Sequence, residues 1–348
     1  MTEKKNEILV RIITKSSTLS DRSMLPNNSH PAFPGGIPRW GSCRFIFDNA
    51  SNYDWIVVYD DFNGDIALKC PAANSLLVTS EPSSVKTYER PYIKQFAYVL
   101  TGQEDWALKH PGKIHSQPAL FWFYGTNQSY DETYRRIPDC KTEVISTVTS
   151  NKQQKHTLHQ KRFKFIEELQ EYMPELDRFG KGIRPVENKS EALDPYRYHI
   201  AIENHICDHW WTEKLSDAFL GLTLPLYYGA PNAADYFPKE SFIPIDLNDF
   251  PKSLQIIKHA IQNNEYKKRL PAIHEARKRV LEKYNFYATV ASIIEERHSY
   301  NQKPAIGQVL RCRHSIRRNP ISAISTLIEK GTKKITFKYL RSYLQKSL

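Results

Sequence analysis

Polar residues able to hold a phosphate group follow one predicted strand near the middle of the chain. The apolar run Tyr198 to Ile202 predicts the strand, and Glu203 and Asn204 come directly after it. Thr212 is suited to cap a following helix that carries Lys214 in its first turn. Ligands of open α/β sheets bind at the carboxyl ends of strands, and a helix N-terminus attracts anions. The segment therefore predicts a diphosphate site to which Lys214 adds a full positive charge.

Glu213, the neighbour of Lys214, is suited to a different part of a nucleotide. A carboxylate repels phosphate, but it accepts hydrogen bonds from a ribose diol, as acidic residues do in dinucleotide-binding folds. The competing interpretation is a capped helix with a solvated Glu213–Lys214 pair and a buried stripe of Leu215, Ala218, Phe219 and Leu222. Spacing alone favours this second interpretation.

Runs of apolar residues predict the elements that position these groups. Strands are expected at Ile8 to Ile13, Trp55 to Tyr59, Leu76 to Thr79, Phe96 to Leu100 and Leu120 to Tyr124. A second series has strands at Thr142 to Val148, Tyr198 to Ile202, Leu224 to Tyr228 and Phe242 to Ile245, helices at Gln160 to Tyr172 and Glu213 to Leu222, and a helical pattern from Phe250 to Tyr300. Alternating strands and helices are typical of parallel α/β sheets. The sequence predicts two Rossmann-like lobes with a cleft between them, joined through a hinge region at Asn127 to Cys140.

The formal net charge of +11 is concentrated near the C-terminus. From Ala305 onward the chain has ten Lys and Arg residues and one acidic residue, Glu329. The remainder has the nearly balanced charge of an ordinary enzyme, which argues against a basic nucleic-acid-binding protein, the alternative of another functional class. Apolar residues at helical spacing predict a basic amphipathic tail suited to anionic lipid headgroups: Ile321, Ile324, Leu327 and Ile328. A merely solvated charged tail is the alternative.

Targeting signals and disulfides are not indicated. No apolar run reaches the roughly 18 residues of a membrane-spanning helix, and the N-terminus lacks the apolar core of a signal peptide. The five cysteines are scattered and include no C-x-x-C pair. We expect a cytoplasmic protein, which the tail would place on the inner face of the cytoplasmic membrane.

The run ENHICDHWWTEKLSDAFLGLTLPLYYGAPNAADYFPKESFI, which begins at Glu203, resembles the donor-binding signature of glycosyltransferase family 10, the α-1,3/1,4-fucosyltransferases, in its bacterial type. That signature has an apolar strand, Phe-Glu-Asn, a short variable stretch ending in Tyr, Thr-Glu-Lys, a helix, Pro-hydrophobic-Tyr/Val-x-Gly and Ser-Phe-Ile/Val. Ile202 stands where the family has Phe, and Trp210 where it has Tyr.

Two further segments carry the resemblance, which covers about residues 38 to 265. The segment VTSNKQQKHTLHQKRFKFIEELQEYMPELDRFGKG is similar to the family's diphosphate-binding region, in which Arg162 matches the arginine. Without that match, Arg162 is one of several basic residues on an amphipathic helix. The segment LLVTSEPSS resembles the family's Glu-Pro segment, in which Glu81 matches the catalytic base; a turn residue is the alternative interpretation.

The resemblance implies a GT-B fold. An acceptor-binding domain would span residues 1–140, a nucleotide-sugar donor domain 141–303, and the basic amphipathic helical tail 304–348. It also implies an inverting transfer of fucose from GDP-fucose to a hydroxyl of an oligosaccharide or lipid-linked glycan, such as lipopolysaccharide.

The implied site draws residues from both domains. Glu81 would take the proton of the acceptor hydroxyl, and Arg162 and Lys214 would hold the leaving diphosphate. By the same resemblance Asn204 and Trp210 would line the donor site, and Glu213 would hold the ribose. An indole lacks a phenolic hydroxyl, so another nucleotide sugar used in surface-polysaccharide synthesis is the alternative donor.

No metal or other cofactor is expected to be essential, because Arg162 and Lys214 can neutralise the diphosphate; a divalent ion remains compatible with the reaction. Asp60 and Asp61 follow a predicted strand and resemble an acidic metal clamp. A second group has the composition of a zinc cluster: His205, Cys207, Asp208 and His209. We interpret both groups as chance.

Overall fold

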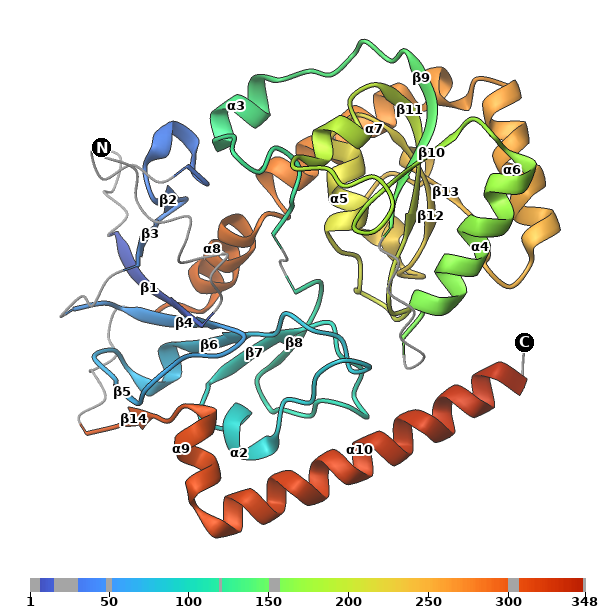
Figure 1. Ribbon diagram of the computed structural model, residues 1–348. Helices are drawn as coiled ribbons and strands as arrows, with labels where there is room; N and C mark the ends of the chain where they lie inside the picture. The colour runs from blue at the N-terminus through green and yellow to red at the C-terminus, as the bar shows by residue number, and fades with distance from the viewer. Residues whose placement is uncertain are drawn as a thin grey trace. The chain divides into compact units, whose positions relative to one another are not determined.

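The computed structural model describes residues 7–15, 31–47, 52–118, 121–149, 157–299 and 307–346 (Figure 1). The chain divides into two compact units. Unit 1 comprises Met1–Pro118 and Val290–Leu348, and unit 2 comprises Ala119–Thr289. These units differ from the predicted domains, because residues 119–140 lie in unit 2 and residues 290–303 lie in unit 1 together with the tail.

Unit 1 is built on a seven-stranded sheet in the order β2-β3-β1-β4-β6-β7-β8, in which only β2 and β3 pair antiparallel. Its strands are β1 (Ile8–Thr14), β2 (Arg39–Trp40), β3 (Cys43–Ile46), β4 (Trp55–Tyr59), β6 (Ser75–Val78), β7 (Tyr98–Thr101) and β8 (Lys113–His115). All five side chains of β4 are buried, as expected for a central parallel strand with both faces covered.

The C-terminal segment is part of unit 1. β14 (Val309–Leu310) pairs antiparallel with β5 (Ile66–Ala67), and α9 (Arg313–Arg318) and α10 (Pro320–Lys346) follow it. Leu310, Cys312 and Ile316 are buried in the same apolar cluster as Ile56 and Val58 of β4. The tail predicted over residues 304–348 therefore contributes to the unit's core before it becomes a long exposed helix.

Unit 2 is a five-stranded, fully parallel sheet in the order β10-β9-β11-β12-β13. Its strands are β9 (Glu143–Val148), β10 (Leu176–Phe179), β11 (Tyr196–Ile202), β12 (Leu224–Tyr228) and β13 (Ile243–Pro244). Its helices are α3 (Tyr130–Arg135), α4 (His159–Tyr172), α5 (Glu213–Leu220), α6 (Phe250–Gln262) and α7 (Glu265–Glu282). The predicted strands and helices of the second series are present within a few residues of their expected bounds.

Short elements complete the chain. α2 (Arg90–Ile93) belongs to unit 1, and α8 (Phe286–Arg297) continues from unit 2 into unit 1. The 3-10 turns are η1 (Pro34–Gly36), η2 (Ala72–Asn74), η3 (Lys189–Ala192), η4 (Ala233–Asp235) and η5 (Lys239–Ser241). No helix within the described residues is long and apolar enough to cross a membrane.

The strand predicted at Leu120 to Tyr124 is wrong. Residues 121–124 form no strand, and residues 119–120 lie outside the described part of the chain. The backbone N–H groups of Phe123 and Tyr124 donate to Asp217 Oδ1 at 2.8 and 2.9 Å. A carboxylate on α5 therefore takes the donors that a neighbouring strand would have needed.

Candidate functional site

The N-terminus of α5 is held against the end of β11 by a buried carboxylate. Glu203 follows β11 and is fully buried; its Oε1 accepts the backbone N–H of Thr212 at 2.8 Å, and its Oε2 accepts the Thr212 hydroxyl at 2.7 Å. The Thr212 side chain in turn accepts the backbone N–H of Lys214, as the predicted cap requires. The sequence thus places a helix N-terminus at the carboxyl end of a parallel strand.

Lys214 lies between two carboxylates at this helix start. Its Nζ is 2.8 Å from Glu213 Oε1 and 3.5 Å from Glu203 Oε2. Burial alone would lower the pKa of Lys214, but Glu213 and Glu203 raise it above its usual value. Burial would raise the pKa of Glu213, but Lys214 and Lys189 lower it to about 2. Both groups are therefore charged at neutral pH.

Arg162 reaches the same region from α4. Its side chain is buried, and its Nη1 donates to Asn204 Oδ1 at 2.8 Å and to the carbonyl of Ile202 at 3.4 Å. Burial lowers the pKa of the guanidinium, against the raising effect of Glu203 and Glu213, and an arginine remains cationic in proteins. Asn204 orients Arg162, a role that the sequence did not predict. Residues 150–156, which precede α4 in the segment that resembles the family's diphosphate-binding region, lie outside the described residues.

A pocket in unit 2 brings several of these side chains together at the ends of β9 and β11. Its lining includes Thr149, Arg162, Lys189, Ile202, Lys214 and Asp217. Among the described residues that line it, Arg162 and Lys214 are present, but Asn204, Trp210 and Glu213 are not. A helix N-terminus and cations at the carboxyl edge of a parallel sheet form an anion site.

Lys189 and Asp217 are pocket residues that the sequence analysis missed. Lys189 Nζ is 2.7 Å from Asp217 Oδ2 and 5.1 Å from the centroid of the Phe123 ring. Asp217 lies four residues after Glu213, so both carboxylates share one face of α5. That spacing was visible in the sequence, but the lysine that completes the group comes from η3 and only the fold brings it there.

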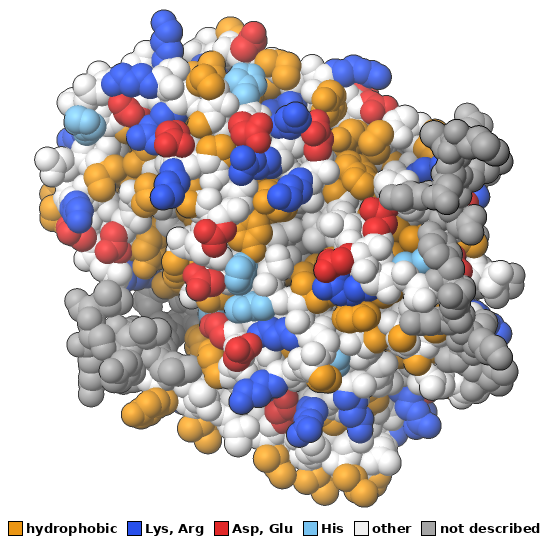
Figure 2. All heavy atoms as spheres, turned by 180° about the vertical axis from the view of Figure 1, so that it is seen from behind, with side chains coloured by type: hydrophobic (Ala, Val, Ile, Leu, Met, Phe, Trp, Pro, Cys, Tyr) orange, Lys and Arg blue, Asp and Glu red, His pale blue; other side chains and the backbone are white. Residues whose placement is uncertain are grey.

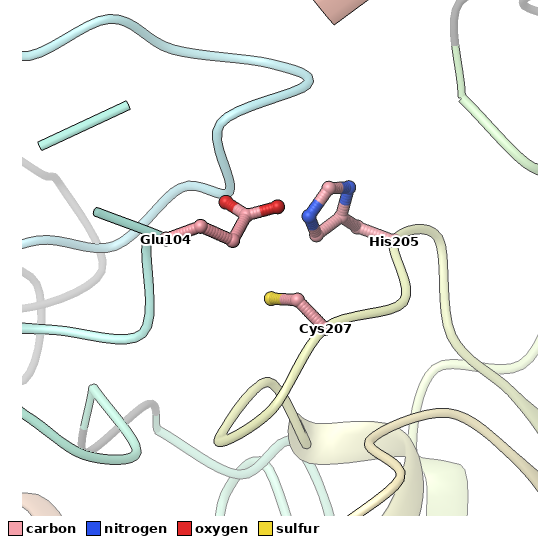
Figure 3. A group of neighbouring side chains, drawn as sticks. All are labelled: Glu104, His205 and Cys207. Atoms are coloured by element: carbon pink, nitrogen blue, oxygen red, sulfur yellow. The ribbon is translucent and has the colours of Figure 1, made fainter. Parts of the chain in front are cut away.

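Trp210 packs away from solvent beside a histidine. Its indole is buried and lies edge-to-face with His205, with ring centroids 6.4 Å apart. His209 Nδ1 is instead hydrogen-bonded to the hydroxyl of Tyr236, and it lies 3.1 Å from Asn232 Nδ2. His209 is thus engaged with residues from the region after β12 and does not join a cluster with His205 and Cys207. Figure 3 shows His205 and Cys207 on the loop that follows β11, and Glu104 on a loop of unit 1.

Glu81 lies in unit 1, in the loop after β6. It is partly buried; its backbone N–H donates to the hydroxyl of Tyr88 at 3.3 Å, and its carbonyl accepts from Gln103 Nε2 at 2.8 Å. Asp60 and Asp61 follow β4 in the same unit. Asp60 is bound to Lys86 and Tyr88, and Asp61 Oδ2 is 3.7 Å from Arg313 Nε. The carboxylates of Asp60 and Asp61 therefore contact donors of the protein itself.

A protein family matches a segment that makes up most of unit 2. Residues 138–294 match the family described as "Glycosyltransferase family 10 (fucosyltransferase) C-term". The alpha-(1,3)-fucosyltransferase FucT of Helicobacter pylori is 35% identical over 75 residues, which are 21% of this chain and 16% of that protein. The GDP-fucose protein O-fucosyltransferase 3 of Danio rerio is 26% identical over 243 residues, 59% of this chain and 52% of that protein. This chain thus spans about half or less of the length of these relatives.

A solved structure supports the fold. The structure described as "alpha1,3-Fucosyltransferase with GDP-fucose" superposes with a TM-score of 0.50 at 17% identity, covering 87% of this chain and 95% of that one. The fold is the predicted GT-B type, with two α/β units whose central sheets are largely parallel. Sequence and fold agree over the unit that carries Arg162 and Lys214, and residues 138–294 therefore belong to glycosyltransferase family 10.

Proposed function

We propose that this protein transfers fucose from GDP-fucose to a hydroxyl group of a glycan acceptor, with the donor bound in the pocket of unit 2. The observation that carries the proposal is the joint presence of Arg162 and Lys214 in one pocket at the start of α5, inside the family-matched segment. Two cations and a helix N-terminus supply the positive charge that a leaving diphosphate needs.

The proposed reaction is an inverting displacement. The acceptor oxygen forms a bond to the anomeric carbon while the bond from that carbon to the diphosphate oxygen breaks, and its electron pair leaves with GDP. Glu81 takes the proton of the acceptor hydroxyl, a step that contributes about 10²- to 10⁴-fold in rate. Arg162 and Lys214 stabilise the charge that develops on the diphosphate, so the reaction requires no metal ion.

Within this proposal, Glu213, which is paired with the pocket residue Lys214, holds the ribose beside the pocket, and Asn204 acts through Arg162. Glu213 is suited because its low pKa keeps it an acceptor at neutral pH. Trp210 stands where the family signature has a tyrosine, so the sugar on the donor can differ from fucose. Another nucleotide sugar used in surface-polysaccharide synthesis is therefore the second candidate donor.

A donor panel tests the proposal. Thermal shifts and transfer assays with GDP-fucose, GDP-mannose and UDP-sugars identify the donor, because a ligand at 100 times its dissociation constant stabilises the folded state by about 2.7 kcal/mol. We expect GDP and GDP-fucose to raise the melting temperature and UDP to leave it unchanged. A response to UDP-sugars alone would overturn the donor assignment.

Chelation tests the expected independence from metal ions. Transfer that persists after exhaustive chelation is expected, and complete loss of transfer would show that a metal is needed.

We further propose that α10 binds an anionic membrane surface beside a lipid-linked acceptor such as lipopolysaccharide. One side of α10 meets unit 1 through Thr326, Lys333 and Phe337: Thr326 is buried, Lys333 contacts the Tyr88 carbonyl, and Phe337 stacks on Trp106. The opposite side exposes a stripe of apolar residues: Ile321, Ile324, Ile328, Ile335 and Tyr339. Apolar side chains follow α10 along the lower edge of the molecule (Figure 2).

Charge beside this stripe supports anionic lipid as the partner. Lys334 and Lys338 are exposed next to it, and each basic residue near such a surface contributes on the order of 1 kcal/mol. Replacing Ile321, Ile324 and Ile328 with Ser should abolish sedimentation with phosphatidylglycerol vesicles, whereas Ser325→Ala should not. Sedimentation of the triple variant equal to that of the original protein would reject the membrane role. These substitutions spare α9, whose removal would open the core of unit 1.

A further inference from the structure

A buried tyrosine in unit 1 accepts hydrogen bonds from the backbone of the loop that carries Glu81. Tyr88 is fully buried, and its hydroxyl accepts the backbone N–H of Ser80 at 3.0 Å and that of Glu81 at 3.3 Å. Burial, and next Asp60, raise the pKa of Tyr88 well above its usual value, so the phenol keeps its proton. The hydroxyl can therefore accept from two amides while it donates its own proton.

Asp60 accepts the hydrogen bond that this hydroxyl donates. The carboxylate of Asp60 is hydrogen-bonded to the Tyr88 hydroxyl and forms an ion pair with Lys86. Asp60 also has a φ angle of 67°, in the left-handed region, directly after β4, while its N–H is paired with the Val78 carbonyl at 2.8 Å. A residue other than glycine is strained in that region, and such strain gathers at functional sites.

Gln103 and Arg313 make two further sets of contacts with the same loop. Gln103 Nε2 donates to the carbonyls of Glu81 at 2.8 Å and Lys86 at 2.9 Å, so it ties the two ends of the loop together. The guanidinium of Arg313, on α9, lies 5.1 Å from the centre of the Tyr88 ring. The loop between β6 and α2 is thus held at its backbone N–H groups, at its carbonyls and at the ring of Tyr88.

We propose that Tyr88, fixed by Asp60, is a positioning residue for Glu81. It sets the place of the Glu81 backbone and hence the reach of its carboxylate toward the acceptor hydroxyl. The inference rests on the proposed function, in which Glu81 is the base. A base must lie within hydrogen-bond reach of the proton it takes, and misplacement by about 1 Å can cost on the order of 100-fold in rate.

Tyr88→Phe tests the role, because it removes the hydroxyl and keeps the ring under Arg313. We expect kcat to fall about 10- to 100-fold, with the KM for the nucleotide sugar and the affinity for GDP unchanged. Hydrogen exchange of the peptide covering residues 79–86 should become faster, because the Ser80 and Glu81 amides lose their acceptor. Tyr92→Phe is the matched control: Tyr92 is also buried beside Arg313, but its hydroxyl donates a long hydrogen bond of 3.4 Å to the backbone carbonyl of Asp60, and the described Ser80 and Glu81 amides donate to Tyr88 instead.

The outcomes separate this inference from the proposed function. If Tyr88→Phe keeps the full kcat while Glu81→Gln loses it, Glu81 is the base and the positioning role is overturned. Unchanged exchange of residues 79–86 overturns it as well, whatever the activity. A Glu81→Gln variant with full activity instead overturns the base assignment, and absence of transfer from every nucleotide sugar overturns the proposed function itself. A purely structural role would lower the melting temperature and leave the kcat of the folded enzyme unchanged.

Discussion

The ammonium group of Lys189 lies 2.7 Å from the carboxylate of Asp217, and that same carboxylate accepts the backbone N–H groups of Phe123 and Tyr124. One buried acid therefore joins η3, α5 and the segment that opens unit 2. The pair belongs to the pocket wall, so its stability matters for the site.

Removing Lys189 should destabilise unit 2. Breaking a buried ion pair costs about 3–5 kcal/mol, and because Lys189 is partly exposed we expect about 2–3 kcal/mol for Lys189→Met. Urea unfolding measures the loss. Lys252→Met, at an exposed position of α6, should stay within about 0.5 kcal/mol of the original protein. A Lys189→Met/Asp217→Asn protein as unstable as the single variant would show that the lost pairing is not the cause.

The contribution of Glu213 to the free energy of unfolding should depend on pH in the acid range. Its pKa is lowered in the folded state to about 2 from its usual value of 4.5, so its stabilising effect is present above about pH 4.5 and is lost as the pH falls toward 2. The difference in unfolding free energy between the original protein and Glu213→Gln should therefore shrink between pH 5 and pH 3. Denaturant titrations at several pH values measure it, and a constant difference would contradict the pairing with Lys214.

Lys141 should give a dependence of the same sign, but at alkaline pH. Its Nζ donates to the carbonyls of Leu193 and Gly221, and burial, opposed by Asp194 and Asp139, lowers its pKa to about 7. Between about 7 and 10.5 the unfolded chain binds more protons at this site, so the folded state gains stability as the pH rises. Relative to Lys141→Met, the original protein should become more stable from pH 7 to pH 10. A flat difference would mean that the folded lysine remains charged throughout.

Glu81→Gln should separate chemistry from binding. Loss of the base is expected to lower turnover by about 10²- to 10⁴-fold, while GDP binds as before because the pocket lies in unit 2. Calorimetric titration of GDP and initial rates of transfer give the two quantities. Weaker GDP binding in this variant would argue that Glu81 acts on the donor.

The helix start at Thr212 could be predicted from the sequence because its determinants are local. A capping threonine and an apolar stripe lie within a few residues of one another, and they place Lys214 at the end of β11. The family resemblance added Arg162, which periodicity alone leaves on an ordinary amphipathic helix.

The features that the sequence analysis predicted wrongly or missed depend on contacts between residues far apart in the chain. Phe123 and Tyr124 have the composition of a strand, but Asp217 captures their amides from more than 90 residues away. Lys189 sits in a polar stretch without periodicity and becomes a pocket residue only through the same carboxylate. The tail was predicted from its exposed charge, and the burial of Cys312 and Ile316 could not be inferred from that pattern.

The insertion of unit 2 between the two parts of unit 1 sets an order for folding during synthesis. Unit 2 is one continuous stretch that ends at Thr289, so it can fold as soon as the ribosome has released it. Unit 1 must wait for Leu310, Cys312 and Ile316 before its core is complete. Until then its apolar surface stays open, and a nascent chain that stalls before residue 316 is the form most exposed to aggregation and to chaperones.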